Sequence, residues 1–450
     1  MCRALRQKPR GLAYAATQMQ ALATELLQQL IRFNTVNPPG NERAAQEHLA
    51  GRLREAGFEV ELAGRTPERP NLVARLRGRA EGPVLGLLSH VDTVLADPED
   101  WQRDPWGGEV VEGELWGRGA QDMKSQTAAE VAAAITLAND GWRPARGDLL
   151  VLVMVDEETG GAEGAHWLTT ERPDLCRCDF LLNEGGGSVM RVGEQAAYGV
   201  SIAEKGVFRF TLTTRGEAGH ASMPGVADNA LPKLAPLLAA LGDPPEAWAI
   251  TDAPRGLLAG LGYGPLSDDD PGPALARFRA DAPEIAAFVD PMSSVTFAAT
   301  RAGASEKINV IPARAWVKVD CRTPPGMGRE GAEAHIRAAL EGLDYELTFD
   351  EQVVGNASAV ETPLMDALRG WIAHEEPDAV VVPTMIPAFT DSRHFRDAFP
   401  ECVAYGFFPQ RHKTLPEMWR MMHARDERID VRDLAWAARC YHDVTKELLG

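Results

Sequence analysis

The sequence lacks any long apolar run. Across its 450 residues no stretch approaches the length of a membrane span, and Met1 to Gln20 carry basic residues without the apolar segment of a secretory signal. We therefore expect no membrane partner and a cytoplasmic location. We also expect residues 1–20 to be a frayed extension ahead of the folded chain.

Cysteine is scarce and scattered. None of the 6 cysteines stands at zinc-finger spacing, and Cys176 and Cys178 are too close together for a comfortable disulfide. This usage favours a reducing environment. The sequence also lacks an internal repeat. No glycine-rich phosphate-binding motif follows a predicted strand, which speaks against a nucleotide-binding α/β protein.

Basic residues are outnumbered by acidic ones. The chain has 46 Lys and Arg against 65 Asp and Glu, a formal net charge of -19. Because phosphate binding needs clustered positive charge, this balance excludes a nucleic-acid partner. We interpret the acidic excess as a solubility feature rather than as a sign of a cationic substrate.

The rest of the composition is that of a folded chain. Hydrophobic residues make up 45%, and the length allows two or three domains. Predicted helices alternate with continuous apolar strands up to Ile202, which is typical of a sheet covered on both faces. VFRFTLTTRG then predicts a strand with one solvated face. Helix and buried strand return after Val360, so we expect one α/β domain interrupted by an α+β module.

The expected elements follow this division. LGYGPLSDDDPGP is rich in Gly, Pro and Asp and is predicted to be a loop. Helices are predicted over residues 21–33, 42–56, 125–139, 229–241 and 330–343. Strands are predicted over residues 71–76, 84–89, 149–155, 180–182, 294–299, 315–321 and 345–349.

A histidine ends one of the apolar strands. In LLSHVDTV, Asp92 follows His90 by two residues, so both side chains lie on the same side of the strand end. Imidazole is a good zinc ligand, and a nearby carboxylate can fix its tautomer. Taken alone, the pattern equally suits a histidine in an ordinary turn.

Acidic residues occupy three further turns. Asp122, in GELWGRGAQDMKSQ, precedes a helix, where a carboxylate either bridges metals or caps the helix. Glu157 and Glu158, in VLVMVDEETGG, follow an apolar strand. Burying adjacent carboxylates is costly without cations, and a solvated turn is the alternative. Glu184, in FLLNEGGG, precedes glycines that let the backbone approach closely.

His423, in RMMHARDERI, completes the series. Alone it would more often be a core or surface residue. Together with His90, Asp122, Glu158 and Glu184 it makes five ligands, most of them at strand ends or turns, where α/β sheets gather their ligands. This set suits zinc, with cobalt or manganese as alternatives. The other histidines lack this context and are interpreted as structural or surface residues.

The order of these motifs resembles a known family. After Met19 the chain is similar to the dinuclear-zinc amidohydrolases and exopeptidases. These include aminoacylase, acetylornithine deacetylase, succinyl-diaminopimelate desuccinylase and the glutamate-type carboxypeptidases. The motifs that carry the resemblance are TVNPPGNE, SHVDTV, GRGAQDMK, DEETGG, NEGGG, GHASMPG, KINVIPA, DCRTPPG and TDSRHF.

The resemblance implies a fold. We expect a mixed central sheet flanked by helices, as in zinc exopeptidases. Residues 1–200 and 355–450 would form the catalytic domain, and residues 201–354 an inserted α+β lid that makes a homodimer.

The resemblance also implies roles at the metal site. Asp122 would bridge two divalent ions. His90 and Glu184 would complete one site, and Glu158 and His423 the other. Glu157 matches the general base, and Asp92 the carboxylate behind His90. The peptide bond from Asp122 to Met123 is expected to be cis.

Further roles are implied for the lid and the substrate. His220 would reach the active site of a neighbouring subunit and stabilise the oxyanion. Asn309 and Arg322 match lid residues that bind polar groups of the substrate. Thr390 lies in a loop that the family uses against a substrate carboxylate.

These assignments predict a metal-dependent hydrolase that cleaves the amide bond of an N-acyl amino acid or small peptide. The nearest alternative is a dipeptidase or carboxypeptidase rather than a deacylase, and Glu184 in place of Asp favours the deacylase. A metal-binding protein without catalysis is less favoured because Glu157 is present. Met123, in place of a second acidic residue, and the basic surroundings of His423 in HARDER leave specificity open.

Overall fold

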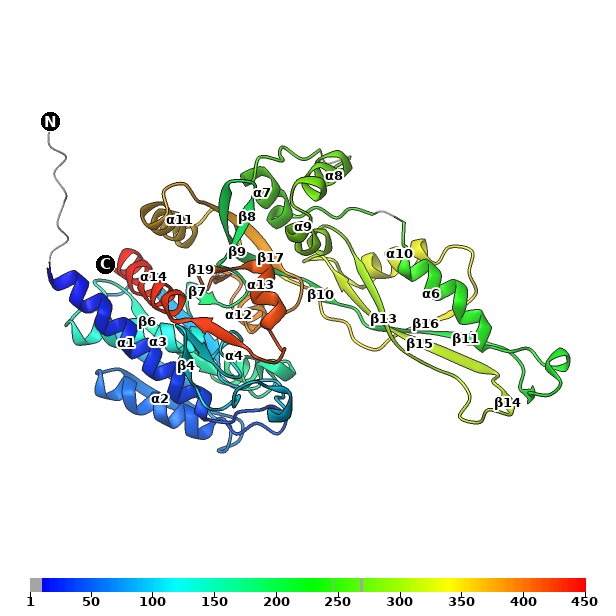
Figure 1. Cartoon of the computed structure of the whole chain (residues 1–450), viewed down its shortest axis with the longest axis horizontal. Helices are drawn as coiled ribbons and strands as arrows, with labels where there is room; N and C mark the ends of the chain where they lie inside the picture. The colour runs from blue at the N-terminus through cyan, green and yellow to red at the C-terminus, as the bar shows by residue number, and fades with distance from the viewer. Residues whose placement is uncertain (1–9, 246, 268–269) are drawn as a thin grey trace.

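The computed structural model describes residues 10–450 except 246 and 268–269. A larger part is built on a 10-stranded sheet and an elongated smaller part on a 5-stranded sheet. The two parts follow one another along the long axis of the molecule (Figure 1). Within the described ranges, no helix has the length and apolar character needed to cross a membrane.

The large sheet is mixed, as predicted. Its central strand β3 runs parallel to β6 and β7, whereas β1, β2 and β8 pair antiparallel with their neighbours β2, β6 and β9. β3 and β6 are buried along nearly their whole length, which explains their continuous apolar sequences. The order is β1 (Glu59–Ala63), β2 (Asn71–Arg77), β6 (Asp148–Met154), β3 (Val84–His90), β7 (Phe180–Asn183), β18 (Val403–Gly406), β9 (Gln195–Glu204), β8 (Ser188–Val192) and β19 (Gln410–Thr414), with β17 (Val380–Ile386) on β9.

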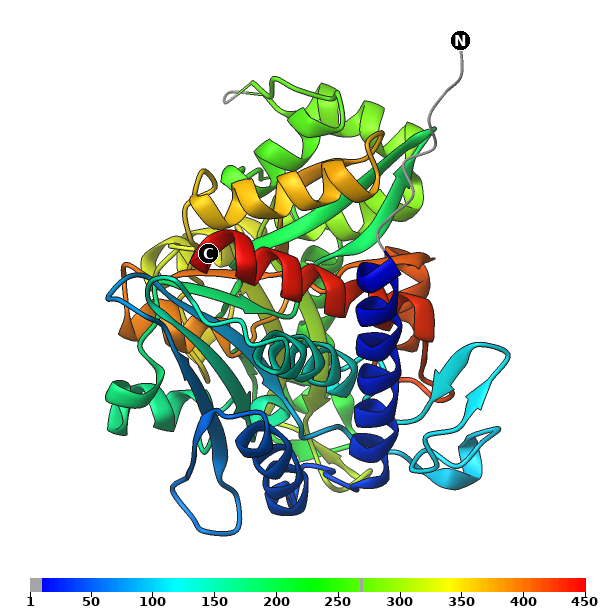
Figure 2. The same cartoon turned by 90° about the vertical axis from the view of Figure 1, so that its left-hand side faces the viewer.

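Helices cover both faces of this sheet. Val151 and Val153 of β6 belong to one hydrophobic core, and Leu150 and Leu152 to another. The first core is shared with α1 (Arg10–Arg32), α2 (Arg43–Glu55), α3 (Lys124–Asn139), α11 (Pro363–Glu375) and α14 (Val431–Leu449). The second is shared with α4 (Ala165–Glu171), α5 (Pro173–Cys176) and α12 (Ser392–Ala398). Figure 2 shows blue α1 and red α14 on the near side.

The first helix begins earlier than expected. α1 starts at Arg10 rather than at residue 21, and Met19 is buried in the core that α1 shares with α3 and α14. Residues 10–20 are therefore helical, and their interpretation as a frayed extension is wrong. Residues 1–9 lie outside the described residues.

The smaller part has a sheet with one covered face. Buried residues alternate with less buried ones along β15 (Arg314–Thr323), as the alternating sequence pattern predicts. Phe210, Val317 and Ile336 belong to a core separate from those of the large sheet. The other strands are β10 (Gly206–Val207), β11 (Phe210–Arg215), β13 (Thr296–Gly303) and β16 (Glu346–Phe349), and the covering helices are α6 (Leu234–Gly242) and α10 (Arg329–Ala339).

Three helices were not expected from the sequence. α7 (Asp252–Gly260), α8 (Gly272–Asp281) and α9 (Pro283–Val289) lie between residues 241 and 294. They share a hydrophobic core with Met190 of β8 and Val382 of β17, so they pack against the large sheet. Of the stretch predicted as a loop, residues 261–273, the first part follows α7 and the last two residues, Gly272 and Pro273, already belong to α8; residues 268–269 are outside the described residues.

Candidate metal centre

Three predicted site residues lie at the ends of adjacent strands. His90 is the last residue of β3, and Glu184 directly follows β7. Glu157 begins a short 3-10 helix, η2 (Glu157–Thr159), shortly after β6. Because β3 pairs in parallel with both β6 and β7, these ends meet at one edge of the sheet.

Asp122 lies between the two predicted histidine ligands. It stands in the turn before α3, and its peptide bond to Met123 is cis, as predicted. One carboxylate oxygen, Oδ1, is 3.3 Å from His90 Nε2, and the other, Oδ2, is 3.0 Å from His423 Nε2. A carboxylate in this orientation offers one oxygen to each of two neighbouring sites.

Two groups of metal-ligand type are arranged around this carboxylate. The first contains His90, Glu157 and Glu184, and the second contains Asp122, Glu158 and His423. Within each group, one ligand atom from each residue lies within 4.8 Å of the others. The structure thus brings together the five residues predicted as ligands, with Glu157 beside them.

The chemistry of these groups fits divalent cations. His90 Nε2 is buried and has no hydrogen-bond partner, and carboxylate oxygens of Glu157 and Glu184 each lie 3.8 Å from it. Several carboxylates at one mostly buried place need compensating positive charge. The mixed nitrogen and oxygen donors suit zinc, cobalt or manganese.

The close packing of buried carboxyl groups shifts the pKa values of the site residues. Burial raises the pKa of Glu157 and Glu184 well above that of a free carboxyl group, and the nearby carboxylates reinforce this. Hydrogen bonding to Asp122 and Glu158 raises the pKa of His423 to about 10. Burial acts to lower the pKa of His90, but the contacts with Asp122 and Asp92 outweigh it and raise that pKa.

Asp92 connects the strand end to the acidic turn. Its Oδ1 lies 3.4 Å from His90 Nδ1. Its two oxygens accept the backbone N–H groups of Glu157 at 3.2 Å and Glu158 at 3.1 Å. Asn37 Nδ2 donates to Asp92 Oδ2 at 2.9 Å. Asp92 therefore orients the His90 ring and positions both glutamates.

Sequence reasoning missed the contribution of Glu427. This buried carboxylate accepts the backbone N–H groups of Gln121 at 2.6 Å and Asp122 at 3.0 Å, and it accepts from Arg118 Nη1 at 2.6 Å. β20 (Arg428–Asp430) pairs beside it with β5 (Glu114–Trp116). The only sequence sign was an acidic residue in HARDER soon after His423, and nothing local indicated its partners.

The residues predicted to bind substrate are mostly elsewhere. Thr390 lines the cavity around the metal ligands, but its hydroxyl donates to Glu204 at 2.7 Å. Arg322 lies in β15 and pairs with Asp320 at 2.6 Å. Neither Arg322 nor any other residue of the smaller part is among the described residues that line this cavity.

His220 and Asn309 lie together at the far end of the smaller part. β12 (Gly219–His220) pairs with β14 (Val310–Ile311), and the Ala221 N–H donates to Asn309 O at 3.1 Å. Both side chains are exposed. Figure 1 shows β14 at the end of the molecule farthest from the large sheet. Within one chain, His220 is therefore remote from the metal ligands.

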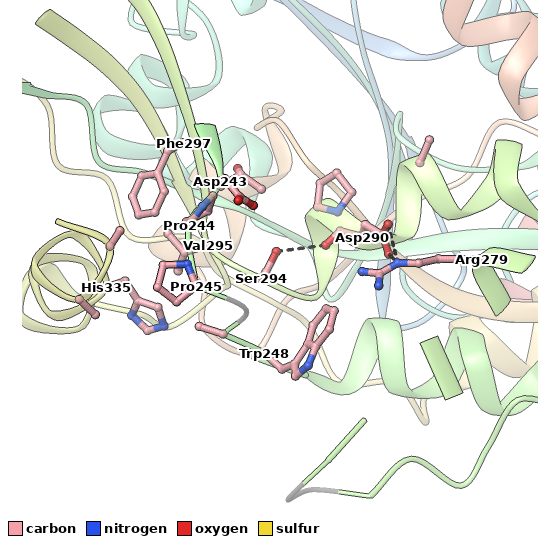
Figure 3. Close-up of a pocket in the computed structure, with 16 residues that line it drawn as sticks. Asp243, Pro244, Pro245, Trp248, Arg279, Asp290, Ser294, Val295, Phe297 and His335 are labelled. Atoms are coloured by element: carbon pink, nitrogen blue, oxygen red, sulfur yellow. Dashed lines mark hydrogen bonds and ion pairs between the residues drawn. The ribbon is translucent and has the colours of Figure 1, made fainter. Parts of the chain in front are cut away.

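A cavity larger than the one around the metal ligands contains none of these residues. A cavity of about 520 Å³ lies between α10 and the α8–α9 segment (Figure 3), and it contains none of the candidate ligands. Its Arg279 pairs with Asp290 at 3.0 Å and lies over the ring of Trp248. The cavity that holds the ligands has about 180 Å³. We place the reaction there because the titratable groups converge in it.

Comparison with known sequences is consistent with this geometry. Residues 86–447 match the model of peptidase family M20/M25/M40. A succinyl-diaminopimelate desuccinylase from Methylorubrum populi is 30% identical over 422 residues, which cover 90% of this chain and 92% of that protein. Succinyl-diaminopimelate desuccinylase 2 from Ruegeria sp. is 35% identical over 223 residues, 48% of this chain and about half (53%) of the relative.

Comparison with solved structures shows the fold. An M20 family metallo-carboxypeptidase from Sulfolobus solfataricus superposes with a TM-score of 0.69 and 16% identity. The superposition covers 95% of this chain and 99% of that one. This likeness extends through both sheets and confirms the predicted fold class.

Proposed function

The chain belongs to peptidase family M20/M25/M40, and from this premise we propose that it hydrolyses the amide bond of an N-acyl amino acid or small peptide. The single observation that supports the reaction best is the orientation of Asp122, with one carboxylate oxygen near His90 and the other near His423. We propose that Asp122 bridges two divalent ions, most suitably zinc, with cobalt or manganese as alternatives. His90 and Glu184 would bind one ion, and Glu158 and His423 the other.

Two ions at this place would lower the pKa of a water molecule and polarise the substrate carbonyl. Glu157 is proposed as the general base because its carboxylate lies beside His90 and is not needed as a metal ligand. It takes a proton from the attacking water and delivers it to the leaving amine. Asp92 keeps His90 and Glu157 in place through the bonds described above.

A substrate panel on metal-reconstituted protein tests this function. We expect hydrolysis of N-acyl amino acids or dipeptides that stops when a chelator removes the metal and returns when metal is added back. The M20 carboxypeptidase fold neighbour makes exopeptidase activity the second candidate, so the panel includes both substrate types. Absence of hydrolysis across the panel in protein that carries its metals would refute the proposal.

We further propose that the smaller part is a lid that forms a homodimer. Large apolar side chains are exposed near β12 and β14, which is unusual on a free surface and marks an interaction site. They are Met223, Val226, Ile308 and Val310. Because α7–α9 pack on the large sheet, the lid would comprise the 5-stranded sheet with α6 and α10 rather than all of residues 201–354.

In this dimer His220 would serve the partner's active site. Mixing His220→Ala subunits with Glu157→Gln subunits tests it, because a heterodimer would have one site with both an intact base and an intact partner histidine. We expect activity to recover on mixing. Heterodimers that form without recovery would exclude catalysis in trans.

A further inference from the structure

The motif TVNPPGNE supplies none of the proposed ligands, yet it lies against the acidic turn, residues 155–163, that follows β6. Val36 of the motif forms a parallel bridge with Thr93, and the Asn37 N–H donates to the Thr93 carbonyl at 2.9 Å. The motif therefore runs beside the chain that follows His90 at the end of β3. From this position the Asn37 side chain reaches the acidic turn.

The carboxylate of Asp156 holds the acidic turn together. Asp156 is buried and has a φ of +71°, in the left-handed region that residues with a side chain rarely adopt. Its Oδ1 accepts from Asn37 Nδ2 at 3.1 Å and from Thr159 Oγ1 at 2.7 Å, and its Oδ2 accepts the Glu163 N–H at 3.0 Å. Because Glu157 follows directly, these bonds set where the proposed base begins.

Arg69 joins Asp156 to the end of the motif. Its Nη1 donates to Asp156 Oδ1 at 3.1 Å, and its Nε donates to Glu42 Oε2 at 3.0 Å. Glu42 is fully buried and stands directly before α2, but its side chain does not cap that helix. Gly40 has a φ of +79°, and a Cβ there would overlap with the Arg69 guanidinium group. The motif thus makes the place in which the guanidinium group lies between two carboxylates.

A second arginine pair joins β2 and β6 at their other end. Arg75 of β2 donates to Asp148 Oδ2, at the start of β6, at 2.7 Å, whereas Arg69 precedes β2 and Asp156 follows β6. β2 and β6 pair antiparallel between these two places. The two arginine side chains are similarly shielded, with exposures of 15% for Arg69 and 18% for Arg75. Two pairs of the same chemistry therefore join one pair of strands, and one of them lies at the end that carries the metal ligands.

We propose that Arg69 is a positioning residue for the reaction. Through Asp156 it fixes the backbone from which the side chains of Glu157 and Glu158 project, so it sets the place of the proposed base and of one proposed ligand. This inference rests on the proposed function. Asp92 accepts the N–H groups of the same two glutamates, and the bond from Arg69 fixes the residue before them.

The test compares Arg69→Met with Arg75→Met in the metal-loaded enzyme, at a temperature where both are folded and on the best substrate of the panel. Arg69→Met should lower kcat about 10–100-fold at saturating metal, the usual effect of losing a residue that orients a ligand. Its KM should change less than about threefold, because substrate binding is not the step affected. Arg75→Met should leave kcat nearly unchanged. Equal losses of kcat in the two variants would overturn the proposal.

A conservative pair of variants covers the case in which Arg69→Met does not fold. Arg69→Lys keeps a positive charge beside Glu42, but an ammonium group does not reproduce the fixed directions in which a guanidinium group bonds to two carboxylates. We therefore expect Arg69→Lys to lose kcat and Arg75→Lys to keep it. Equal kcat in these two variants would likewise overturn the proposal.

A double variant shows whether Arg69 acts through Asp156. Asp156→Asn keeps the shape of the side chain and its tolerance of a positive φ, but weakens the bond to Arg69. If the two residues act as a unit, Arg69→Met combined with Asp156→Asn should lose no more kcat than the more damaging single variant. Losses that multiply would show that Arg69 acts elsewhere and would contradict the assignment.

Metal binding tests the positioning without the reaction. Because Glu158 is a proposed ligand, Arg69→Met should bind its second Zn²⁺ at least about tenfold more weakly than Arg75→Met does, as measured by calorimetry. If the wild type takes up metal but hydrolyses nothing in the panel, the proposed function fails and this comparison still decides the role of Arg69. Weaker binding by Arg69→Met alone then supports the role, and equal affinity of the two variants overturns it.

Discussion

The two candidate metal groups are built in different ways. His90, Glu157 and Glu184 are mostly buried and follow strands of the parallel centre of the large sheet. In the other group, the His423 side chain is 52% exposed and the residue has a φ of 56°, uncommon for a residue with a side chain. The sheet fixes the first group, whereas the second relies on a loop between α13 and β20.

Because of this difference, we expect the two groups to hold their ions with different affinity. A buried ligand set loses little conformational freedom when an ion binds, so the strand-end group should hold its ion more tightly. The His423 side chain is more accessible to solvent, so we expect the ion beside it to exchange more readily. The variants below test this contrast, beginning with the largest expected effect.

Removal of a ligand should affect the two groups unequally. We expect His90→Ala to abolish hydrolysis and to lower the metal content from two ions per chain, because it also leaves Glu157 and Glu184 crowded without compensation. His423→Ala should lose the second ion but keep the first. Metal analysis after dialysis measures both. His90→Ala that binds as much metal as wild type would refute the strand-end site.

Loss of the base should separate chemistry from binding. Glu157→Gln is expected to keep both metals and lose roughly 10²–10⁴-fold in kcat, the usual contribution of general-base catalysis. Turnover and metal content are measured on the same preparation. Activity within about threefold of wild type would remove Glu157 from the mechanism.

The loop that carries Asp122 should depend on Glu427. Glu427→Gln keeps the shape of the side chain but weakens its bonds to Arg118 and to the N–H groups of Gln121 and Asp122. We expect metal affinity or activity to fall about 10–100-fold, as is usual for residues that orient ligands. The control is Glu114→Gln, which changes a carboxylate on neighbouring β5 that pairs with Lys413 and Arg428 instead. Equal effects of the two variants would contradict a specific role for Glu427.

Metal binding should release protons. The pKa of His423 is raised to about 10, so the metal-free protein holds a proton on this ring near neutral pH, and the raised pKa of Glu157 and Glu184 makes these carboxyl groups keep their protons to higher pH than free carboxyl groups do. An ion must displace them, so affinity should increase with pH, by about tenfold per pH unit for each proton released. Calorimetry in buffers of different protonation enthalpy counts these protons. His423→Ala should lower the count, and an affinity independent of pH would contradict the prediction.

Much of the strand-end group could be predicted from the sequence. His90 and Glu184 end apolar runs and Glu157 closely follows one, and parallel strands bring such ends together whatever the rest of the chain does. The one-sided sheet of the smaller part was also predictable, because its alternating pattern reflects local burial. The helices α7–α9 were not. They are short and interrupted by Gly and Pro, and their apolar residues become buried by packing against one another and against β8 and β17.

The sequence by itself determined the fold class and pointed to the residues of the candidate metal centre, because periodicity and motif order are local properties of the chain. The tertiary structure alone decided that Glu427 holds the Asp122 turn and that α7–α9 pack against β8 and β17 of the large sheet. These contacts join segments that are distant in the sequence, and no local pattern encodes them, since a buried carboxylate or apolar side chain has the same sequence signature whichever neighbour it meets.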